Sequence, residues 1–200
     1  MAATSALINA LTAVATRDSY TQGGETDHAA LAAAIREIAR DVSADDMYEA
    51  ATHFRDRPDI ATPLLEDVVR AQPNNSRALV RLANCYWLLG AGPQPVAELA
   101  SRAIAADPQD RAAWHLWALA DEQPRGRVDR WQQVATRFPE DDLALANVAD
   151  NAASVAGAEH DYEMVDVAIA AYETLRSRAK REEERAAVDR ALETLRKWRF

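Results

Sequence analysis

The residue types that most often carry catalysis or bind metals are few in this sequence and lie far apart. Its four histidines, His28, His53, His115 and His160, include no pair three or four residues apart, the spacing that places two ligands on one helix face. His160 lies in the acidic segment EHDYE, which could bind a cation weakly. Acidic residues at a helix start more often serve as caps and favour its dipole, so we predict no metal site and no cofactor.

The single cysteine, Cys85, lacks the neighbours that nucleophilic chemistry requires. It lies between Asn84 and Tyr86, and a nucleophile would need a base such as His115 beside it. We expect it to act as a small packed hydrophobic side chain instead. The sequence contains no GxGxxG, Walker-type, GxSxG or HExxH motif, so we do not expect an enzyme. One cysteine without a CxxC partner is typical of a reducing, cytoplasmic compartment.

Charge and hydropathy argue against two classes of partner. The formal net charge of −9 repels a phosphate backbone, so we expect no nucleic acid partner. The early apolar residues Leu7, Ile8, Leu11 and Val14 follow no basic residue and form too short a run to span a membrane. We therefore expect neither a signal peptide nor a membrane partner. Arginine greatly outnumbers lysine and alanine is abundant, a bias typical of bacterial genomes rich in G and C.

The elements that would position these residues are helices arranged in repeats. The sequence is rich in alanine, the best helix former, and poor in glycine. Three similar segments, VVRAQPNN, AIAADPQD and VATRFPED, contain Pro73, Pro108 and Pro139, which lie 35 and 31 residues apart. This spacing brackets the roughly 34-residue period of helix-turn-helix repeats. Proline cannot continue the helix it follows, and the polar residues after it favour a turn and the N-cap of the next helix.

The best-formed unit, Ala78 to Pro108, resembles the tetratricopeptide repeat (TPR) family. It pairs the runs ALVRLANCYWLLG and VAELASRAIAADP, and the resemblance rests on Leu82, Ala83, Tyr86, Gly90, Val96, Ala100, Ala103 and Pro108. The resemblance implies an all-α fold, a right-handed α-solenoid of antiparallel helix pairs. Its repeats would cover approximately 43–75, 76–110, 111–141 and 142–176, and the segment EQPRGR would be the turn inside the third repeat.

The chain outside the repeats is expected to add a helix at each end. Residues 1–26 would form a separable amphipathic helix followed by the glycine-containing linker Ser19–Asp27, ahead of a repeat domain at 27–200. A C-terminal helix at 180–199 carries the stripe Val188, Leu192 and Leu195. We predict that it caps the last repeat, and the alternative is docking between copies or on a partner.

The family resemblance also implies where a ligand would bind. In TPR proteins the first helix of each pair lines a concave groove, and the matching positions here are Arg77, Arg81, Asn84, Trp87 or Leu88, His115, Leu119, Asn147, Asp150 and Asn151. Asparagine there bonds a peptide backbone in related repeats, since its amide both donates and accepts. The alternative is that Asn84 and Asn147 bond their own helix or water.

Charged positions in this set point to the class of ligand. Arg77 and Arg81, one turn apart, would favour an acidic ligand, and the alternative is a plain solvated face. His115 and Leu119 stand where TPR proteins that clamp a chaperone's terminal carboxylate would offer basic groups. That departure argues against a carboxylate clamp of the usual kind.

The sequence thus predicts a non-catalytic adaptor or scaffold that binds a protein or peptide partner in its groove. One alternative is a self-assembling module that forms homo-oligomers through its terminal helices. Another is a helical enzyme or cofactor-binding domain built around Trp87, Trp114 and Trp117, although we expect these tryptophans to lie in the core.

Overall fold

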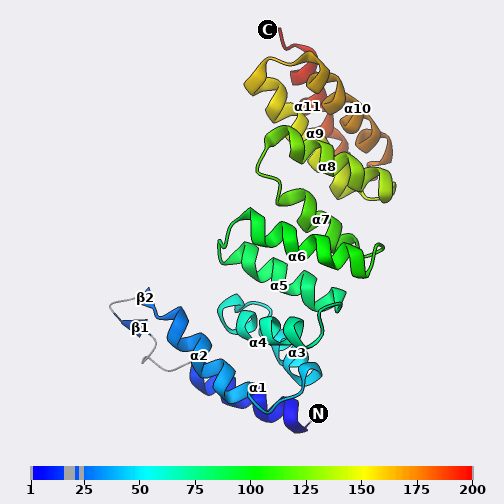
Figure 1. Cartoon of the computed structure of the whole chain (residues 1–200). Coiled ribbons are helices and arrows are strands. Elements are labelled where there is room, and N and C mark those ends of the chain that lie inside the picture. Colours follow the sequence, from blue (N-terminus) through cyan, green and yellow to red (C-terminus); the bar gives the residue numbers. More distant parts are fainter. Residues whose placement is uncertain (1, 16–20, 23–24, 200) are drawn as a thin grey trace. The chain divides into compact units, whose positions relative to one another are not determined.

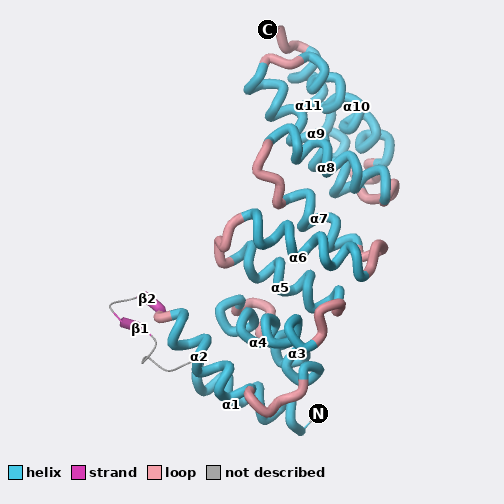
Figure 2. The backbone as a smooth tube through the Cα atoms, viewed as in Figure 1, coloured by secondary structure: helices cyan, strands magenta, loops and turns pink. Residues whose placement is uncertain are grey.

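The computed structural model describes residues 2–15, 21–22 and 25–199, and this part of the chain is almost entirely helical (Figures 1 and 2). Strands β1 (Thr21–Gln22) and β2 (Glu25–Thr26) form a two-residue antiparallel ladder. The predicted linker contains this ladder, and its positions 19–20 and 23–24 lie outside the described residues. The helices are α1 (Ala2–Ala15), α2 (His28–Ala39), α3 (Ala44–His53), α4 (Pro58–Ala71), α5 (Ser76–Leu88), α6 (Pro93–Ala106), α7 (Arg111–Leu119), α8 (Pro124–Arg137), α9 (Asp142–Glu159), α10 (Tyr162–Arg178) and α11 (Glu182–Arg196).

The helices form two compact units, Met1–Leu116 and Trp117–Phe200. In the first unit α4 packs on α2, α3 and α5, and α5 packs on α6. In the second unit α9 packs on α8 and α10, and α10 also contacts α11. Several alanines on the packed helix faces have no exposed surface, among them Ala50, Ala51, Ala78, Ala83, Ala100 and Ala103 in the first unit. Small side chains at these positions let paired helices approach each other, as the sequence predicts.

The residue two positions after each repeat-ending proline caps the next helix. Asn75 accepts a hydrogen bond from the Ala78 amide at 3.1 Å, Asp110 from the Ala112 amide at 3.0 Å, and Asp141 from the Leu143 amide at 3.1 Å. Each side chain satisfies a backbone donor that the first helical turn leaves unpaired. The prediction that these turns end one helix and start the next is confirmed.

Helix α1 contributes to the core of the first unit. Leu7, Leu11 and Val14 are buried, and α1 packs on both α2 and α3. The Thr4 hydroxyl also donates to the Asp46 carboxylate on α3. The sequence shows the apolar stripe of α1 but does not show that α2 and α3 bury it. This packing argues against a separable helix, and the prediction needs an experimental test.

Helix α11 covers the apolar surface of the second unit. Leu192 and Leu195 are buried, and Leu195 joins the core cluster that includes Val155 and Val165. A Cβ placed on Gly157 of α9 would lie 3.3 Å from the Trp198 ring, so the ring packs against the glycine backbone. These contacts support the prediction that the C-terminal helix acts as a cap. Within the described ranges, no helix is both long and apolar enough to cross a membrane.

Two local expectations are wrong. The segment EQPRGR is not all turn, because α8 begins at Pro124, and proline is well tolerated at the first helical position. Gly126 makes this possible, since a Cβ there would lie 2.8 Å from the Asp121 carboxylate. The tryptophans expected in the core are not buried: Trp114 and Trp117 are half-buried and Trp87 is exposed. Trp117 packs against a charged side chain instead of the apolar core, because its ring centre lies 4.6 Å from the Arg130 guanidinium carbon.

Replacing Ala100 with proline tests the helix pairing of α5 and α6. Ala100 has no exposed surface in the middle of α6, and proline there removes a hydrogen bond and clashes with the preceding turn, which costs about 3 kcal/mol or more. Gln94→Pro is the matched control, because Gln94 lies in the first turn, where backbone amides have no intrahelical partner. Thermal melts should show a large loss for A100P only, and equal melting temperatures would mean that this segment is not a helix.

Replacing Leu11 with alanine tests whether α1 belongs to the core. Removing this buried side chain should lower the free energy of unfolding by about 2–5 kcal/mol. Asn9→Ala, at an exposed position of the same helix, should change it by no more than about 0.5 kcal/mol. Chemical denaturation of both variants makes the comparison, and a Leu11→Ala chain as stable as the parent would support the separable helix.

Candidate functional site

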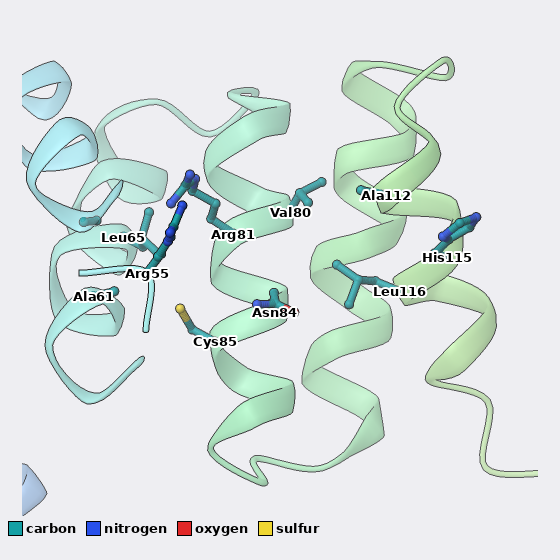
Figure 3. A pocket seen from close by; sticks show the side chains of 11 residues that line it. Arg55, Ala61, Leu65, Val80, Arg81, Asn84, Cys85, Ala112, His115 and Leu116 are labelled. Carbon is teal, nitrogen blue, oxygen red and sulfur yellow. The ribbon is translucent and has the colours of Figure 1, made fainter. Parts of the chain in front are cut away.

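A cavity of about 450 Å³ lies along α5 in the first unit, and we call it the α5 groove (Figure 3). Helices α3, α4, α5 and α7, with the residues just after α3, contribute to its lining. Besides the thiol of Cys85, the polar or charged side chains in the lining are Arg55, Arg81, Asn84 and His115. Apolar groups that include Leu65, Val80 and Leu116 form the remaining walls. The groove therefore combines hydrogen-bond donors with apolar surface.

Two arginines of α5 lie against one aromatic ring of α3. The guanidinium carbons of Arg77 and Arg81 are each 5.5 Å from the centre of the Tyr48 ring. This geometry follows from the helix period, because residues four apart lie on the same face of α5. The opposite face carries the buried residues Leu79 and Ala83, which fix the orientation of the arginine face. A guanidinium stacked on a ring keeps its edges available to hydrogen-bond acceptors.

The two arginines stacked on Tyr48 have no carboxylate partner among the described residues. Among the described residues, Arg77 and Arg81 form no ion pair, and Arg55 approaches only the adjacent Asp56, at 3.6 Å with both side chains exposed. Many other arginines are paired, as Arg57 with Asp59 at 2.7 Å and Arg130 with Asp121 at 2.8 Å show. In a protein with a formal net charge of −9, this cluster is a local concentration of uncompensated positive charge.

Beyond the arginines, α5 presents an amide and then apolar side chains. Asn84 is exposed in the groove lining, and its side chain makes no hydrogen bond to any described residue. Trp87, Leu88 and Leu89 follow with exposed fractions of 41%, 57% and 43%. The helix ends there because Gly90 adopts a φ of +69°, and its amide donates to the Trp87 carbonyl at 3.1 Å.

Hydrogen bonds on its other side hold α5 in place. The Tyr86 hydroxyl donates to Glu66 of α4 at 2.8 Å, and Glu66 also pairs with Arg36 of α2. Burial, followed by the bond to Glu66, raises the pKa of Tyr86 to about 12. The phenol therefore stays protonated and keeps donating throughout the neutral range, which fixes the position of the groove-lining helix.

Cys85 lies at the floor of the α5 groove, where it is buried and forms no disulfide. Burial raises the pKa of its thiol, although a hydrogen bond with Thr62 and the charge of Arg81 act in the opposite direction. A raised pKa leaves the thiol protonated at neutral pH, and the protonated form is a poor nucleophile. The expectation of a packed, buried cysteine is confirmed.

The structure brings together part of the predicted site. Arg81, Asn84 and the half-buried His115 line the α5 groove, and Arg77 and Trp87 lie on the same helix as the first two. Leu119 is half-buried at the end of α7 and does not line the groove. The sequence analysis did not identify the lining residue Arg55 or the ring of Tyr48, which contacts Arg77 and Arg81. Tyr48 lies on α3 whereas Arg55 follows the end of that helix, so helical spacing in the sequence gives no signal that brings the two together.

The three predicted site residues of α9 have partners within the second unit. The Asn147 amide donates to the Leu143 carbonyl at 2.9 Å, and the Asn151 amide donates to the Asn147 carbonyl at 2.8 Å. Asp150 accepts a hydrogen bond from the Tyr172 hydroxyl, and burial together with this bond raises the pKa of Tyr172. For Asn147 this is the own-helix alternative considered above, whereas Asn84 has no such bond. Their part in binding stays a prediction.

The acidic segment around His160 forms helix caps and ion pairs. Asp161 caps α10 by accepting from the Glu163 amide at 2.8 Å, and Arg125 pairs with both Glu159 and Asp161. The hydrogen bond from Arg125 is the largest cause that lowers the pKa of Asp161. This is the capping role that the sequence analysis favoured over cation binding.

Comparison with known proteins identifies the fold. No protein-family model matches the chain, and no curated protein matches it in sequence. Solved structures do match in shape. MamA from Desulfovibrio magneticus RS-1, residues 41 to the end, is 16% identical with a TM-score of 0.56, and the match covers 98% of each chain. YrrB, described as a TPR protein with an unusual peptide-binding site, is 16% identical with a TM-score of 0.57, covering 92% of this chain and 90% of its own.

A third solved structure, PilF from Pseudomonas aeruginosa, is 14% identical with a TM-score of 0.53, and the match covers 96% of this chain and 91% of that chain. The chain therefore has a TPR-like helical-repeat fold, as its sequence predicts. At these identities the likeness concerns the fold alone.

Thiol labelling tests the environment of Cys85. Because the pKa of the buried thiol is raised, a disulfide reagent should modify the folded chain at least about tenfold more slowly at neutral pH than the chain in denaturant. The rate should increase as the pH rises, since the thiolate is the reacting form. Equal rates for the folded and unfolded chains would contradict the buried, protonated thiol.

Proposed function

We propose that this protein is a non-catalytic adaptor or scaffold that holds a peptide segment of a partner protein in the α5 groove. The observation that carries the proposal is the pair Arg77 and Arg81, stacked on Tyr48 without a carboxylate partner among the described residues. Asn84, exposed beside them with an unused amide, adds a donor and an acceptor for a peptide backbone. We place the protein in a bacterial cytoplasm because of its coding bias and single cysteine.

The chemistry of the groove favours holding a ligand over transforming it. Arg55, Arg81 and Asn84 of its lining bind acceptors without exchanging protons at neutral pH. Its thiol is buried with a raised pKa, which disfavours nucleophilic attack. The similar fold of YrrB, whose description mentions a peptide-binding site, adds support by analogy.

Self-assembly through the terminal helices is the alternative, and it has less support. The apolar stripes of both helices are used inside their own units, since Leu7 and Leu11 of α1 and Leu192 and Leu195 of α11 are buried. A docking helix would keep such a stripe exposed. Light scattering distinguishes the two functions, because self-assembly makes the apparent mass rise with protein concentration.

Paired binding and melting measurements on Arg81→Ala and Asn84→Ala test the proposal. A peptide selected against the full chain by display serves as ligand for calorimetry. Each substitution should weaken binding by about 1–3 kcal/mol, because a ligand group loses its partner. Asn84 is exposed, so its replacement should change stability by no more than about 0.5 kcal/mol. Arg81→Ala also removes the contact with the Tyr48 ring, so its stability should fall by about 1 kcal/mol at most. Arg70→Ala, at an exposed arginine of α4 paired with Asp67, is the control and should bind normally.

Asn147→Ala, measured alongside, decides whether the α9 residues take part. Its amide already donates within its own helix, so we expect a smaller loss of affinity than for Asn84→Ala. Normal binding by both Arg81→Ala and Asn84→Ala would contradict the proposal that the α5 groove holds the ligand. Loss of folding in either variant would assign that side chain a structural role instead.

A further inference from the structure

The exposed face of α5 changes character along its length. Arg77, Arg81, Asn84 and Leu88 are spaced by four, three and four residues, which places them on one stripe of the helix. The N-terminal part of this stripe is cationic, its middle offers an amide, and its C-terminal part is apolar. A ligand lying along the stripe therefore meets three different kinds of surface in a fixed order.

The cationic end is built to receive more than one carboxylate. Two guanidinium groups lie against the Tyr48 ring, and Arg55 adds a third cation at the same groove. Carboxylates bound to these groups form charge-assisted hydrogen bonds, which are among the strongest in proteins. A single carboxylate at a chain terminus would leave part of this charge uncompensated. A segment with several Asp or Glu side chains would supply several carboxylates.

The apolar end is exposed without a described partner to cover it. Trp87, Leu88 and Leu89 are consecutive and account for three of the five large hydrophobic side chains that are exposed in the described part of the chain. Several large apolar side chains exposed close together at one helix end are a feature of interaction sites. The positive φ of Gly90 ends the helix directly after them, so they stand at the rim of the stripe.

The spacing of the two ends sets the spacing in the ligand. Arg81 and Leu88 are seven residues apart and Arg77 and Leu88 eleven, so at 1.5 Å per helical residue the ends are separated by about 10 to 16 Å. An extended peptide advances about 3.3 Å per residue and covers this distance in roughly three to five residues.

From these observations we infer that the partner presents an extended segment with a pair of acidic side chains and a large apolar side chain about three to five residues away. The acidic pair binds Arg77 and Arg81, and the apolar side chain covers Leu88. The inference rests on the proposed function and adds the class of segment that the groove selects.

Defined peptides test this inference on the full chain. Each probe is a labelled peptide with an acetylated N-terminus and an amidated C-terminus, in which a Glu-Glu pair and a Leu-Phe pair are separated by spacers from zero to about eight glycine and serine residues, in both orders. Fluorescence anisotropy gives the affinities. We expect the tightest binding at spacers of about two to four residues, which place the two pairs three to five residues apart, and roughly tenfold or greater weakening when Gln-Gln replaces Glu-Glu. Added salt should weaken only the peptides that contain glutamate.

Variants of the protein assign each end of the peptide to its partner. Arg77→Gln combined with Arg81→Gln should abolish the preference for Glu over Gln while keeping the preference for Leu-Phe over Ala-Ala. Leu88→Ser should abolish the preference for Leu-Phe over Ala-Ala while keeping the preference for Glu over Gln. The matched control for the arginines is Arg70→Gln, at an exposed arginine of α4. The control for Leu88, which is 57% exposed, is Leu143→Ser in the second unit, where Leu143 is 58% exposed. Neither control should change either preference.

Several outcomes would overturn the inference. These are equal binding of glutamate and glutamine peptides, indifference to the spacer, binding that needs a free C-terminal carboxylate, or binding only when the acidic pair is replaced by phosphoserine. The display selection described above separates this failure from failure of the proposed function. Selected peptides without acidic residues whose affinity still falls in Arg81→Ala would leave the function standing and remove the inference. Peptides insensitive to Arg81→Ala and Asn84→Ala would remove both.

Discussion

The close approach of paired helices across alanine contacts is the constraint on which the rest of the structure depends. Ala78 and Ala83 have no exposed surface on the inner face of α5, and Ala100 and Ala103 have none on α6. Once these faces are buried, the helix period places Arg77, Arg81 and Asn84 on the opposite face of α5, and Arg81 and Asn84 there line the groove. The groove is thus a consequence of packing on the other side of the same helix. Larger side chains at the alanines would move α5 and separate Arg81 from Tyr48.

Much of the fold follows from the sequence because its signals are local. The prolines at 73, 108 and 139 end helices for steric reasons, and the side chains of Asn75, Asp110 and Asp141 start the next ones by bonding free amides. Neither effect needs distant residues. The exposed stripe on α5 is also a local feature, because the helix period alone determines which residues share a face. The spacing therefore places Arg81 and Asn84 on one face of this helix, and the TPR resemblance assigns that face to the groove.

The remaining features depend on packing between helices, which spacing does not show. Arg55 reaches the groove from beyond the end of α3, and only the packing of α3 on α4 brings it there. Asn84 and Asn147 occupy matching sequence positions, yet only Asn147 bonds its own helix. The apolar stripe of α1 can be recognised in the sequence, but the surface of α2 and α3 that buries Leu11 cannot. In each case the deciding partner is distant in the sequence.

The central claim is that the ligand binds along α5 in the first unit. Backbone amide chemical shifts, recorded by NMR for the isotopically labelled full chain with and without a display-selected peptide, test it most directly. The account predicts that the largest changes fall within α3 and the residues after it, within α5 and at the start of α7, around Tyr48, Arg81 and Asn84. Changes confined to α1, α10 and α11, with α5 unaffected, would contradict it.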